Sequence, residues 1–584
     1  IGPGNTDTFF RLYRDNYVEE KDIAAIAGWG FDHVRLPFHY KDFWNLDTEQ
    51  IREEGFQLLD KFLEWCRTHD VKVILDMHAA PGAQNSGNIS DSDGEARLWT
   101  EPDPYQDWTL AIWTEIAGRY ANDTLIIGYD LLNEPVLPDG IPGSDLRDLY
   151  VRLAEAVRQV DSNHILFIEG NWYATDFSAL TPPFDDNMVY AFHKYWNSTG
   201  QGTIQYLIDL REETGVPLWL GETGENSNPW FYAVRTMVEE NGIGWNWWTH
   251  KKIETLTAPT SAPFAPGYEA VVAYWDGAGP RPSESAAREA LYAMATGLDL
   301  DSTTTNHGVV ASLLADDFGA TAKPFREHLI PGEIHAVDYD LGDQGIGYSD
   351  ADPWTVSGSP GIGNTGGQYR NDGVDIEEST DPQGFDFNVG WIEAIEWLRY
   401  TVNVESEGKY DIEFRVASAG TGGQFLVTLD GETLGNVDAP VTGGWQTWRS
   451  AWLREVEFPA GPHVLRLSVR RGNFNLNSMR FKETSHTPVE NLRLPEESRL
   501  EVFPNPTSRG ATLGFRTAWP AGVSIAVVDM LGRRTELQSK RSFGPGDHQV
   551  HVDLPSASGT YVIELHFDAG EQTRLQRVPV TVIP

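Results

Sequence analysis

Short apolar runs of the kind that form buried strands alternate with amphipathic, helix-length segments through the first half of the chain. Runs such as 71–77 and 165–169 are strand-like, whereas 145–160 repeats its apolar residues with helical spacing. Strands that alternate with helices pair in parallel and are joined by crossover helices. Because this pattern continues through residues 1 to about 325, it predicts an α/β fold, a (β/α)₈ TIM barrel whose active site lies at the carboxyl ends of the strands.

The same pattern yields seven strands rather than eight. The earliest clear run is 33–37 and the last is 243–248, and residues 1–15 are rich in glycine and polar groups. Two explanations remain open. Either the first strand lies within 8–13, or an N-terminal piece is absent from the chain.

Residues beyond the barrel change to short alternating segments between glycine-rich turns, which is typical of β-sandwiches. The sequence therefore predicts four parts: a catalytic barrel over 1–325, a β-sandwich over 331–482, a polar linker over 483–498 and a smaller β-sandwich over 499–584.

Charge and composition exclude several kinds of partner. The chain of 584 residues has a formal net charge of −42, which argues against nucleic acid and anionic membranes, since phosphate groups require clustered Lys and Arg. No apolar run approaches the length of about 18 residues that would suggest a membrane span. A single cysteine, Cys66, falls in a helical pattern and is expected to be a buried small residue. We expect a monomer.

Two glutamates, Glu134 and Glu222, each follow a strand-like run. Their separation fits three βα units, so the two side chains could face each other across the barrel mouth. A pair of carboxyl groups placed in this way supplies the acid and base needed to hydrolyse a glycosidic bond.

Residues 16 to about 300 resemble glycoside hydrolase family 5, the cellulase-type retaining β-glycanases. The stretches that carry the resemblance are His33–Pro37, Asp76–His78, Asn133–Pro135, His193–Tyr195, Gly221–Glu222 and Trp247–Trp248. The resemblance implies that Glu134 is the acid/base and Glu222 the nucleophile.

The resemblance also implies roles for the neighbours of these glutamates. Arg35 and Tyr195 would keep Glu222 ionised and oriented, and Asn133 would bind the sugar 2-hydroxyl. His78 and His193 would orient sugar hydroxyls, and Trp248 would form the floor of the cleaved subsite. Trp44, Trp172 and His39 are expected to line further subsites. No cofactor or catalytic metal is expected, since no His-x-His pair occurs.

Residues 331–482 resemble carbohydrate-binding module family 6. The stretches behind this resemblance are Ile330–Gly332, Gly367–Ile376, Asn388–Ile392, Thr442–Trp445 and Phe474–Asn477. The resemblance implies that Trp391 and Trp445 clamp a sugar ring and that Asn475 binds its hydroxyls. The first strand reads Ile334–Asp338, without the acidic pair usual in that family, which puts a structural calcium ion there in question.

Residues 499–584 resemble the C-terminal sorting domain of the type IX secretion system. The motifs are Val502–Pro506, Asp529–Arg533 and Leu554–Tyr561. The resemblance implies that the type IX secretion machinery is a partner and that the protein is secreted or held at a bacterial cell surface.

Together these features predict a secreted retaining endo-β-1,4-glucanase that hydrolyses a polysaccharide by double displacement. Alternatives on the same fold are a β-1,3- or mixed-linkage glucanase, a mannanase and an exo-acting glycosidase. A second alternative is a polysaccharide-binding surface protein without catalysis, against which the presence of Arg35, Glu134, Tyr195 and Glu222 argues. If barrel and sandwich are independent modules, deleting the residues after about 330 should leave activity on soluble substrates intact.

Overall fold

The computed structural model describes residues 1–353, 364–485, 500–517, 521–529, 533–568 and 573–583. The chain divides into two compact units, Ile1–Ser485 and His486–Pro584. Most of the linker expected at 483–498 lies outside the described residues, as do residues 530–532 of one sorting motif. No helix in the described ranges is long and apolar enough to cross a membrane.

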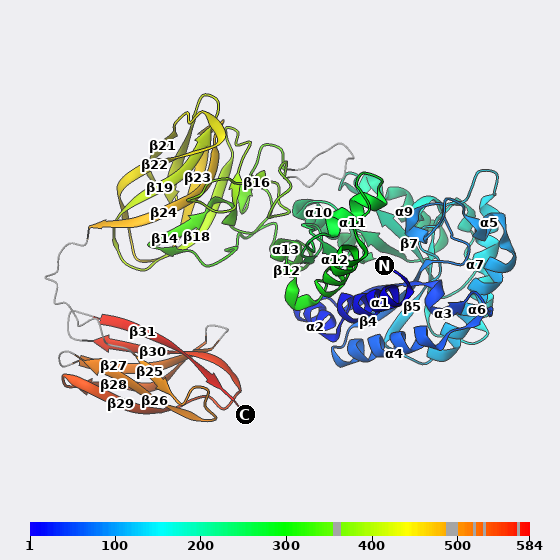
Figure 1. Cartoon of the computed structure of the whole chain (residues 1–584), viewed down its shortest axis with the longest axis horizontal. Helices are drawn as coiled ribbons and strands as arrows, with labels where there is room; N and C mark the ends of the chain where they lie inside the picture. The colour runs from blue at the N-terminus through cyan, green and yellow to red at the C-terminus, as the bar shows by residue number, and fades with distance from the viewer. Residues whose placement is uncertain (354–363, 486–499, 518–520, 530–532, 569–572, 584) are drawn as a thin grey trace. The chain divides into compact units, whose positions relative to one another are not determined.

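A curled sheet of seven parallel strands forms the centre of the first unit (Figure 1). In spatial order its strands are β1 (His33–His39), β4 (Lys72–Ala79), β5 (Ile126–Asp130), β6 (Ile165–Glu169), β7 (Met188–Lys194), β8 (Leu218–Thr223) and β9 (Gly244–Trp245). The helices between and beyond them include α2 (Glu20–Trp29), α4 (Glu53–Thr68), α6 (Pro102–Tyr120), α7 (Gly143–Arg158), α9 (Gln205–Thr214), α10 (Asn228–Glu240), α12 (Glu284–Thr296) and α13 (His307–Leu314). The predicted α/β fold, a TIM-like parallel sheet with crossover helices, is confirmed.

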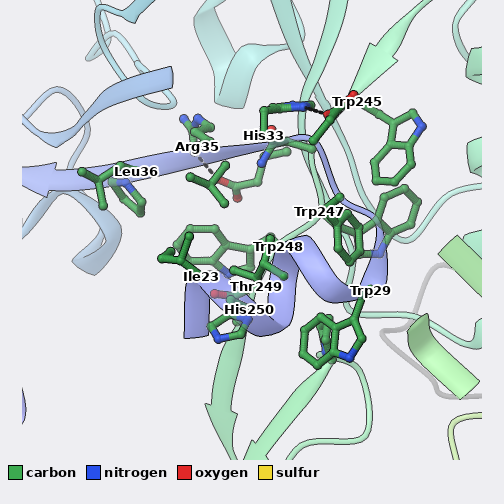
Figure 2. Close-up of a pocket in the computed structure, with 18 of the residues that line it drawn as sticks. Ile23, Trp29, His33, Arg35, Leu36, Trp245, Trp247, Trp248, Thr249 and His250 are labelled. Carbon is green, nitrogen blue, oxygen red and sulfur yellow. Dashed lines mark hydrogen bonds and ion pairs between the residues drawn. The ribbon is translucent and has the colours of Figure 1, made fainter. Parts of the chain in front are cut away.

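The sheet stays open between its first and last strands in the described residues, because β1 pairs only with β4 and β9 only with β8. A cavity of about 510 Å³ lies here, lined from both edges and from α2 (Figure 2). Figure 2 shows Trp245 and Trp247 toward the right, Arg35 and Leu36 toward the left, and Trp248 between them.

The expectation that the first strand lies within 8–13 is wrong, because these residues belong to helix α1 (Pro3–Tyr17). Its aromatic residues recur every fourth position, and Tyr13 stacks on Tyr17 with ring centroids 5.2 Å apart. Phe9, Tyr13 and Tyr17 pack against a small apolar cluster that includes Met294 of α12. A spacing of four places side chains on one face of a helix, whereas a strand face needs a spacing of two.

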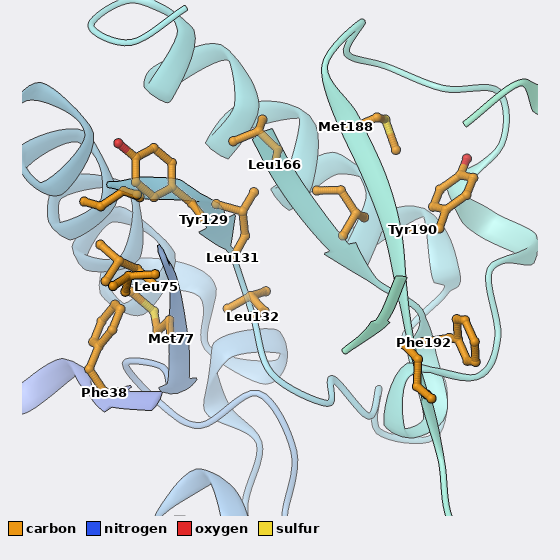
Figure 3. Packing of buried hydrophobic residues seen from close by; sticks show 14 of the residues in the cluster. Phe38, Leu75, Met77, Tyr129, Leu131, Leu132, Leu166, Met188, Tyr190 and Phe192 are labelled. Atoms are coloured by element: carbon orange, nitrogen blue, oxygen red, sulfur yellow. The ribbon is translucent and has the colours of Figure 1, made fainter. Parts of the chain in front are cut away.

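Alternation along each strand separates the apolar side chains from the functional ones. On β4, Leu75 and Met77 join the large core between sheet and helices, whereas Ile74 belongs to a second cluster inside the curl. Figure 3 shows the outer layer, with Leu75, Met77, Leu166 and Tyr190 projecting from their strands. Since successive side chains of a strand point to opposite faces, the other residues of these strands face inward. Cys66 of α4 is buried in the outer core, as expected.

Two β-sheets complete the first unit and form a β-sandwich around their own apolar core. One sheet runs β13 (Leu329–Ile330), β18 (Trp397–Val404), β23 (Gly461–Arg471), β20 (Gly423–Leu429) and β21 (Glu432–Ala439). The other runs β16 (Ile376–Glu378), β17 (Phe387–Val389), β24 (Asn475–Ser485), β19 (Gly408–Ser418) and β22 (Gly444–Phe458).

The second unit is also a β-sandwich, with a separate core around Val523, Ile525 and Ile563. Its three-stranded sheet consists of β25 (Glu501–Phe503), β26 (Gly510–Thr517) and β29 (Gly546–Asp553). Its four-stranded sheet consists of β28 (Arg534–Phe543), β27 (Ala521–Asp529), β30 (Gly559–Asp568) and β31 (Thr573–Val582).

Candidate active site

Glu222, near the end of β8, is held by two donors, Arg35 on β1 and Tyr195 just after β7. Arg35 Nη1 donates to Glu222 Oε2 at 3.0 Å, and the Tyr195 hydroxyl donates to Glu222 Oε1 at 2.8 Å. Burial, together with the negative charge of Glu222, raises the pKa of Tyr195 well above its ordinary value, so that hydroxyl remains a donor. Each carboxylate oxygen therefore has a fixed partner, which sets the orientation of Glu222.

Arg35 is bound by three further carboxylates that the sequence analysis did not assign to the site. Its guanidinium lies 3.1 Å from Asp76, 2.8 Å from Asp130 and 3.0 Å from Glu169. Burial, together with the charge of Glu169, raises the pKa of Asp130 well above its ordinary value, which limits how many of these groups ionise at once. Asp130 and Glu169 each end a strand, and that position is the signal that could have revealed them.

Glu134 follows β5 in a left-handed backbone conformation, with φ of 45°. Its main-chain N–H donates to Glu169 Oε2 at 2.6 Å, and its Oε1 lies 2.7 Å from His193 Nδ1. One side-chain oxygen of Glu134, one of Glu222 and one ring nitrogen of His193 all lie within 4.8 Å of one another. The structure therefore brings together the two glutamates that the sequence predicted would meet.

The pKa values of Glu134 and His193 are shifted in opposite directions. Burial alone raises the pKa of Glu134, but the hydrogen bond and the charge of His193 outweigh it and bring the pKa below 4.5. Burial lowers the pKa of His193, but the charges of Glu169 and Glu222 outweigh it and raise the pKa well above 6.5. In the free protein the proton of this pair accordingly rests on His193.

Asn133 presents an unused donor to the site. Its side-chain oxygen accepts from Arg35 Nη2 at 2.8 Å, whereas its Nδ2 is buried and has no hydrogen-bond partner among the described residues. A buried amide left unpaired is costly, and a ligand hydroxyl could satisfy it.

His78 and Trp248 form one wall of the site. Their rings are parallel with centroids 5.1 Å apart, and His78 Nδ1 lies 2.8 Å from Asp76 Oδ2. Burial lowers the pKa of His78, but Asp76 outweighs it and raises that pKa.

Of the three residues expected to line further subsites, one is buried in the core and two are not. Trp44 is buried in the core and lies 5.8 Å from the ring of Trp108, so its expected role in a subsite is wrong. Trp172 is 62% exposed, and the ring of His39 lies 3.0 Å from Asp91.

A second polar cleft, of about 640 Å³, lies at one end of the first sandwich. Trp391 and Trp445 line it and are 50% and 46% exposed, so neither belongs to the core. Asn475 Nδ2 donates to Glu377 Oε1 at 2.7 Å and to the Trp445 carbonyl at 3.0 Å. The structure thus places all three predicted residues around one cleft and adds Glu377 to them.

The segment Ile334–Asp338, expected to be a strand, spans the end of β14 (Gly332–His335) and a short 3₁₀ helix (Ala336–Asp338), and its carboxylate does not fit a calcium site. The carboxylate of Asp338 lies 3.3 Å from Arg326 and 3.2 Å from His335, and it accepts from the Tyr369 hydroxyl at 2.6 Å. Cationic and hydroxyl donors occupy the oxygens that a calcium ion would require.

Comparison with known proteins gives a family for the barrel and a family for the first sandwich. Residues 4–252 match the family described as Cellulase (glycosyl hydrolase family 5), and residues 368–483 match Carbohydrate binding module (family 6). Endoglucanase C of Acetivibrio thermocellus is 36% identical, with 88% of its length and 42% of this chain matched. The chain belongs to glycosyl hydrolase family 5.

Two other relatives match smaller shares of this chain than Endoglucanase C does. A Beta-xylosidase of Phanerodontia chrysosporium is 34% identical, but the match spans 41% of its length and 33% of this chain. Cellodextrinase A of Ruminococcus flavefaciens is 29% identical, with 77% of its length and 39% of this chain matched. Among solved structures, an endoglucanase of Thermotoga maritima has 16% identity and a TM-score of 0.34, with 47% of this chain and 90% of that chain covered.

Proposed function

We propose that this chain is a retaining endo-β-1,4-glucanase. The observation that carries the proposal is the approach of Glu134 and Glu222 to within 4.8 Å. Carboxyl groups about 5–5.5 Å apart form a covalent glycosyl intermediate, whereas inverting enzymes need about 6.5–9.5 Å to admit a water between them.

In this mechanism Glu222 attacks the anomeric carbon as a carboxylate. Arg35 and Tyr195 each donate to one of its oxygens and hold both in place. Asn133 Nδ2, which has no partner of its own, donates to the sugar 2-hydroxyl and strengthens that bond in the transition state. Trp248, whose ring stacks on that of His78, supports the apolar face of the sugar whose glycosidic bond is cleaved.

Glu134 and His193 deliver the proton to the leaving oxygen. The proton moves from His193 Nδ1 to Glu134 across 2.7 Å and then to the glycosidic oxygen as that bond breaks. Esterification of Glu222 removes one of the two charges that raise the pKa of His193. Glu134 next accepts a proton from water, which attacks the intermediate and releases the sugar with its original configuration.

The substrate class rests on the relatives rather than on the site. The names Endoglucanase C and Cellodextrinase A favour a β-1,4-linked glucan. Products formed early from cellulose, mixed-linkage glucan, β-1,3-glucan and mannan, resolved by size, test this choice. Long products from cellulose support endo cleavage, and exclusive release of short ends supports the exo alternative.

A mechanism-based label tests the nucleophile. A 2-deoxy-2-fluoro glucoside or cellobioside with a good leaving group should attach to Glu222, and peptide mass analysis should locate it there. Glu222→Ala should abolish labelling and turnover, whereas Glu213→Ala, an exposed glutamate at the end of α9, should change neither. Turnover that persists in Glu222→Ala would mean that another residue is the nucleophile, whereas a wild-type chain without turnover would favour the non-catalytic alternative.

We propose that the first sandwich binds the polysaccharide that the barrel cleaves. Exposed Trp391 and Trp445 provide flat faces for a sugar ring, and Asn475 with Glu377 supplies polar groups at the base of the cleft. We assign the catalytic barrel to 1–325 and this module to 331–482.

The final part of the proposal concerns export. Residues 499–584, after a linker over 483–498, would form the sorting domain read by the type IX secretion machinery and place a monomeric enzyme outside the cell. The separate compact core of the second unit supports a detachable domain. Fusion of 499–584 to a fluorescent protein in a bacterium with this machinery should export the fusion, and retention inside the cell would overturn the assignment.

A further inference from the structure

Four buried residues join the barrel to the first sandwich. We call them the amide joint: Asn226 and Asn228 from the barrel, Asn371 and Asp372 from the sandwich, all at most 7% exposed. Asn371 Nδ2 donates to the Asn226 carbonyl at 2.6 Å and to Asn228 Oδ1 at 3.2 Å. Asn228 Nδ2 donates to Asp372 Oδ1 at 2.8 Å. Breaking these buried hydrogen bonds costs free energy, because each donor or acceptor loses its partner while water reaches it poorly.

The joint also caps the helix that follows Glu222. Helix α10 begins at Asn228, and the preceding residue Ser227 makes no side-chain capping bond. The Asn371 carbonyl accepts from the Asn228 main-chain N–H at 2.8 Å. Asp372 adds a carboxylate at the same helix terminus, where negative charge is favourable. The sandwich thus caps α10 in place of a side chain from the barrel itself.

Only a short segment separates this helix from Glu222. The main-chain N–H of Trp248 donates to the Thr223 carbonyl at 2.6 Å. Gly224 has φ of 152°, and a Cβ added there would lie 2.1 Å from the Trp248 carbonyl oxygen. The segment 222–228 is therefore fixed to the barrel wall at one end and to the amide joint at the other.

The sandwich side of the joint is equally well supported. Arg370 Nε donates to Asp372 Oδ2 at 2.8 Å, and its guanidinium lies 3.7 Å from the ring centroid of Tyr339. Gly373 N–H donates to the Tyr348 hydroxyl at 3.0 Å. Both tyrosines are fully buried in the sandwich core. The sandwich side of the amide joint is therefore held in place by the core of the sandwich.

We infer that Asn371 is a positioning residue for Glu222, and that the sandwich is a part of the catalytic unit as well as a sugar-binding module. This inference rests on the proposed function. It changes the expectation for a chain cut after about residue 330, which would lose the cap of α10 and, with it, activity even on soluble substrates.

The test uses the full chain with Asn371→Ala, which removes the side-chain hydrogen bonds to Asn226 and Asn228 that hold the capping carbonyl of Asn371 in place. Asn436→Ala, an exposed asparagine on β21 of the same sandwich, is the matched control. Hydrolysis of cellotetraose gives kcat and KM, and hydrogen exchange followed by mass spectrometry measures the protection of 222–240. Because misplaced catalytic groups cost up to about 100-fold in rate, we expect kcat to fall roughly tenfold with KM within about twofold. We also expect faster exchange in 222–240, and no change in the control.

A folded Asn371→Ala protein with wild-type kcat, or with wild-type exchange in 222–240, would overturn the inference. If that variant does not fold, Asn371→Ser keeps a smaller polar side chain, and the same two measurements decide. Failure of the proposed function is a distinct result, in which the wild-type chain hydrolyses no polysaccharide. In that case hydrogen exchange in 222–240 is the measurement that tests the inference.

Discussion

One carboxylate oxygen of Glu134 and one of Glu222 lie within 4.8 Å of each other, although two negative charges at this distance repel. Separate cations offset the repulsion. Arg35 pairs with Glu222 at 3.0 Å, and His193 pairs with Glu134 at 2.7 Å. Each carboxylate therefore has its own cation, which allows the two glutamates to lie this close in one site.

Replacement of the proton donor should make the rate depend on the leaving group. Glu134→Gln cannot protonate a glycosidic oxygen, so hydrolysis of cellooligosaccharides should fall by about 10²–10⁴-fold, the usual contribution of acid–base catalysis. Formation of the intermediate from an aryl glycoside with an acidic phenol should be far less affected. Pre-steady-state release of the phenol measures that step. Equal losses on both substrates would contradict the role of Glu134.

Removal of Arg35 should destabilise the barrel as well as inactivate it. Arg35→Ala leaves Asp76, Asp130 and Glu169 buried without their cation, and breaking a buried ion pair in this way costs about 3–5 kcal/mol. Urea denaturation gives the free energy of unfolding. Arg67→Ala is the control, because its guanidinium is half exposed and such pairs contribute about 1 kcal/mol or less. Similar stability for the two variants would contradict this account of the site.

The Glu134–His193 pair should give stability a defined pH window. The pKa of His193 is raised above 6.5, so its contribution is complete below about pH 6.5 and is lost as pH rises through the raised value. The pKa of Glu134 is lowered below 4.5, so its contribution is present above about pH 4.5 and is lost as pH falls through the lowered value.

His193→Asn should therefore reduce the free energy of unfolding most between about pH 4.5 and 6.5, and less at alkaline pH. Denaturation curves of both proteins across this range measure the difference. A difference that does not vary with pH would show that His193 acts only through packing.

Loss of the exposed tryptophans should weaken adhesion to insoluble glucan. Trp391→Ala and Trp445→Ala should each cost about 1 kcal/mol, roughly a fivefold loss of affinity. Trp452→Ala, on β22 beneath Arg454 and away from the cleft, is the control. Depletion assays measure binding, and equal affinity for all three variants would count against the cleft.

Deletion of the second unit should leave the enzyme intact. Residues 486–584 form their own compact unit with a separate core, so a chain ending at Ser485 should keep its kcat and its unfolding temperature. Calorimetry and hydrolysis of a soluble glucan test this. A lower unfolding temperature of the remaining domains would mean that the units stabilise each other.

The sequence by itself determined the fold class and most of the residues that form the site. Along β1, β4, β7 and β8 successive side chains point to opposite faces, so Leu75 and Met77 pack toward the helices while Arg35 faces the inside of the curl, and this rule is local. Strand-end positions of Glu134 and Glu222 then sufficed to predict that they meet. Of the two explanations for the missing first strand, a strand within 8–13 is wrong, because the spacing of four in Phe9, Tyr13 and Tyr17 is that of a helix.

Only the tertiary structure decided which distant groups touch. Trp44 looks like a surface aromatic in the sequence but is buried against Trp108, and Glu169 contacts Arg35 across the curl of the sheet. Asn371 caps a helix more than a hundred residues earlier in the chain. Such contacts depend on how whole elements pack, and packing is a sum over many weak interactions that no single stretch of sequence contains.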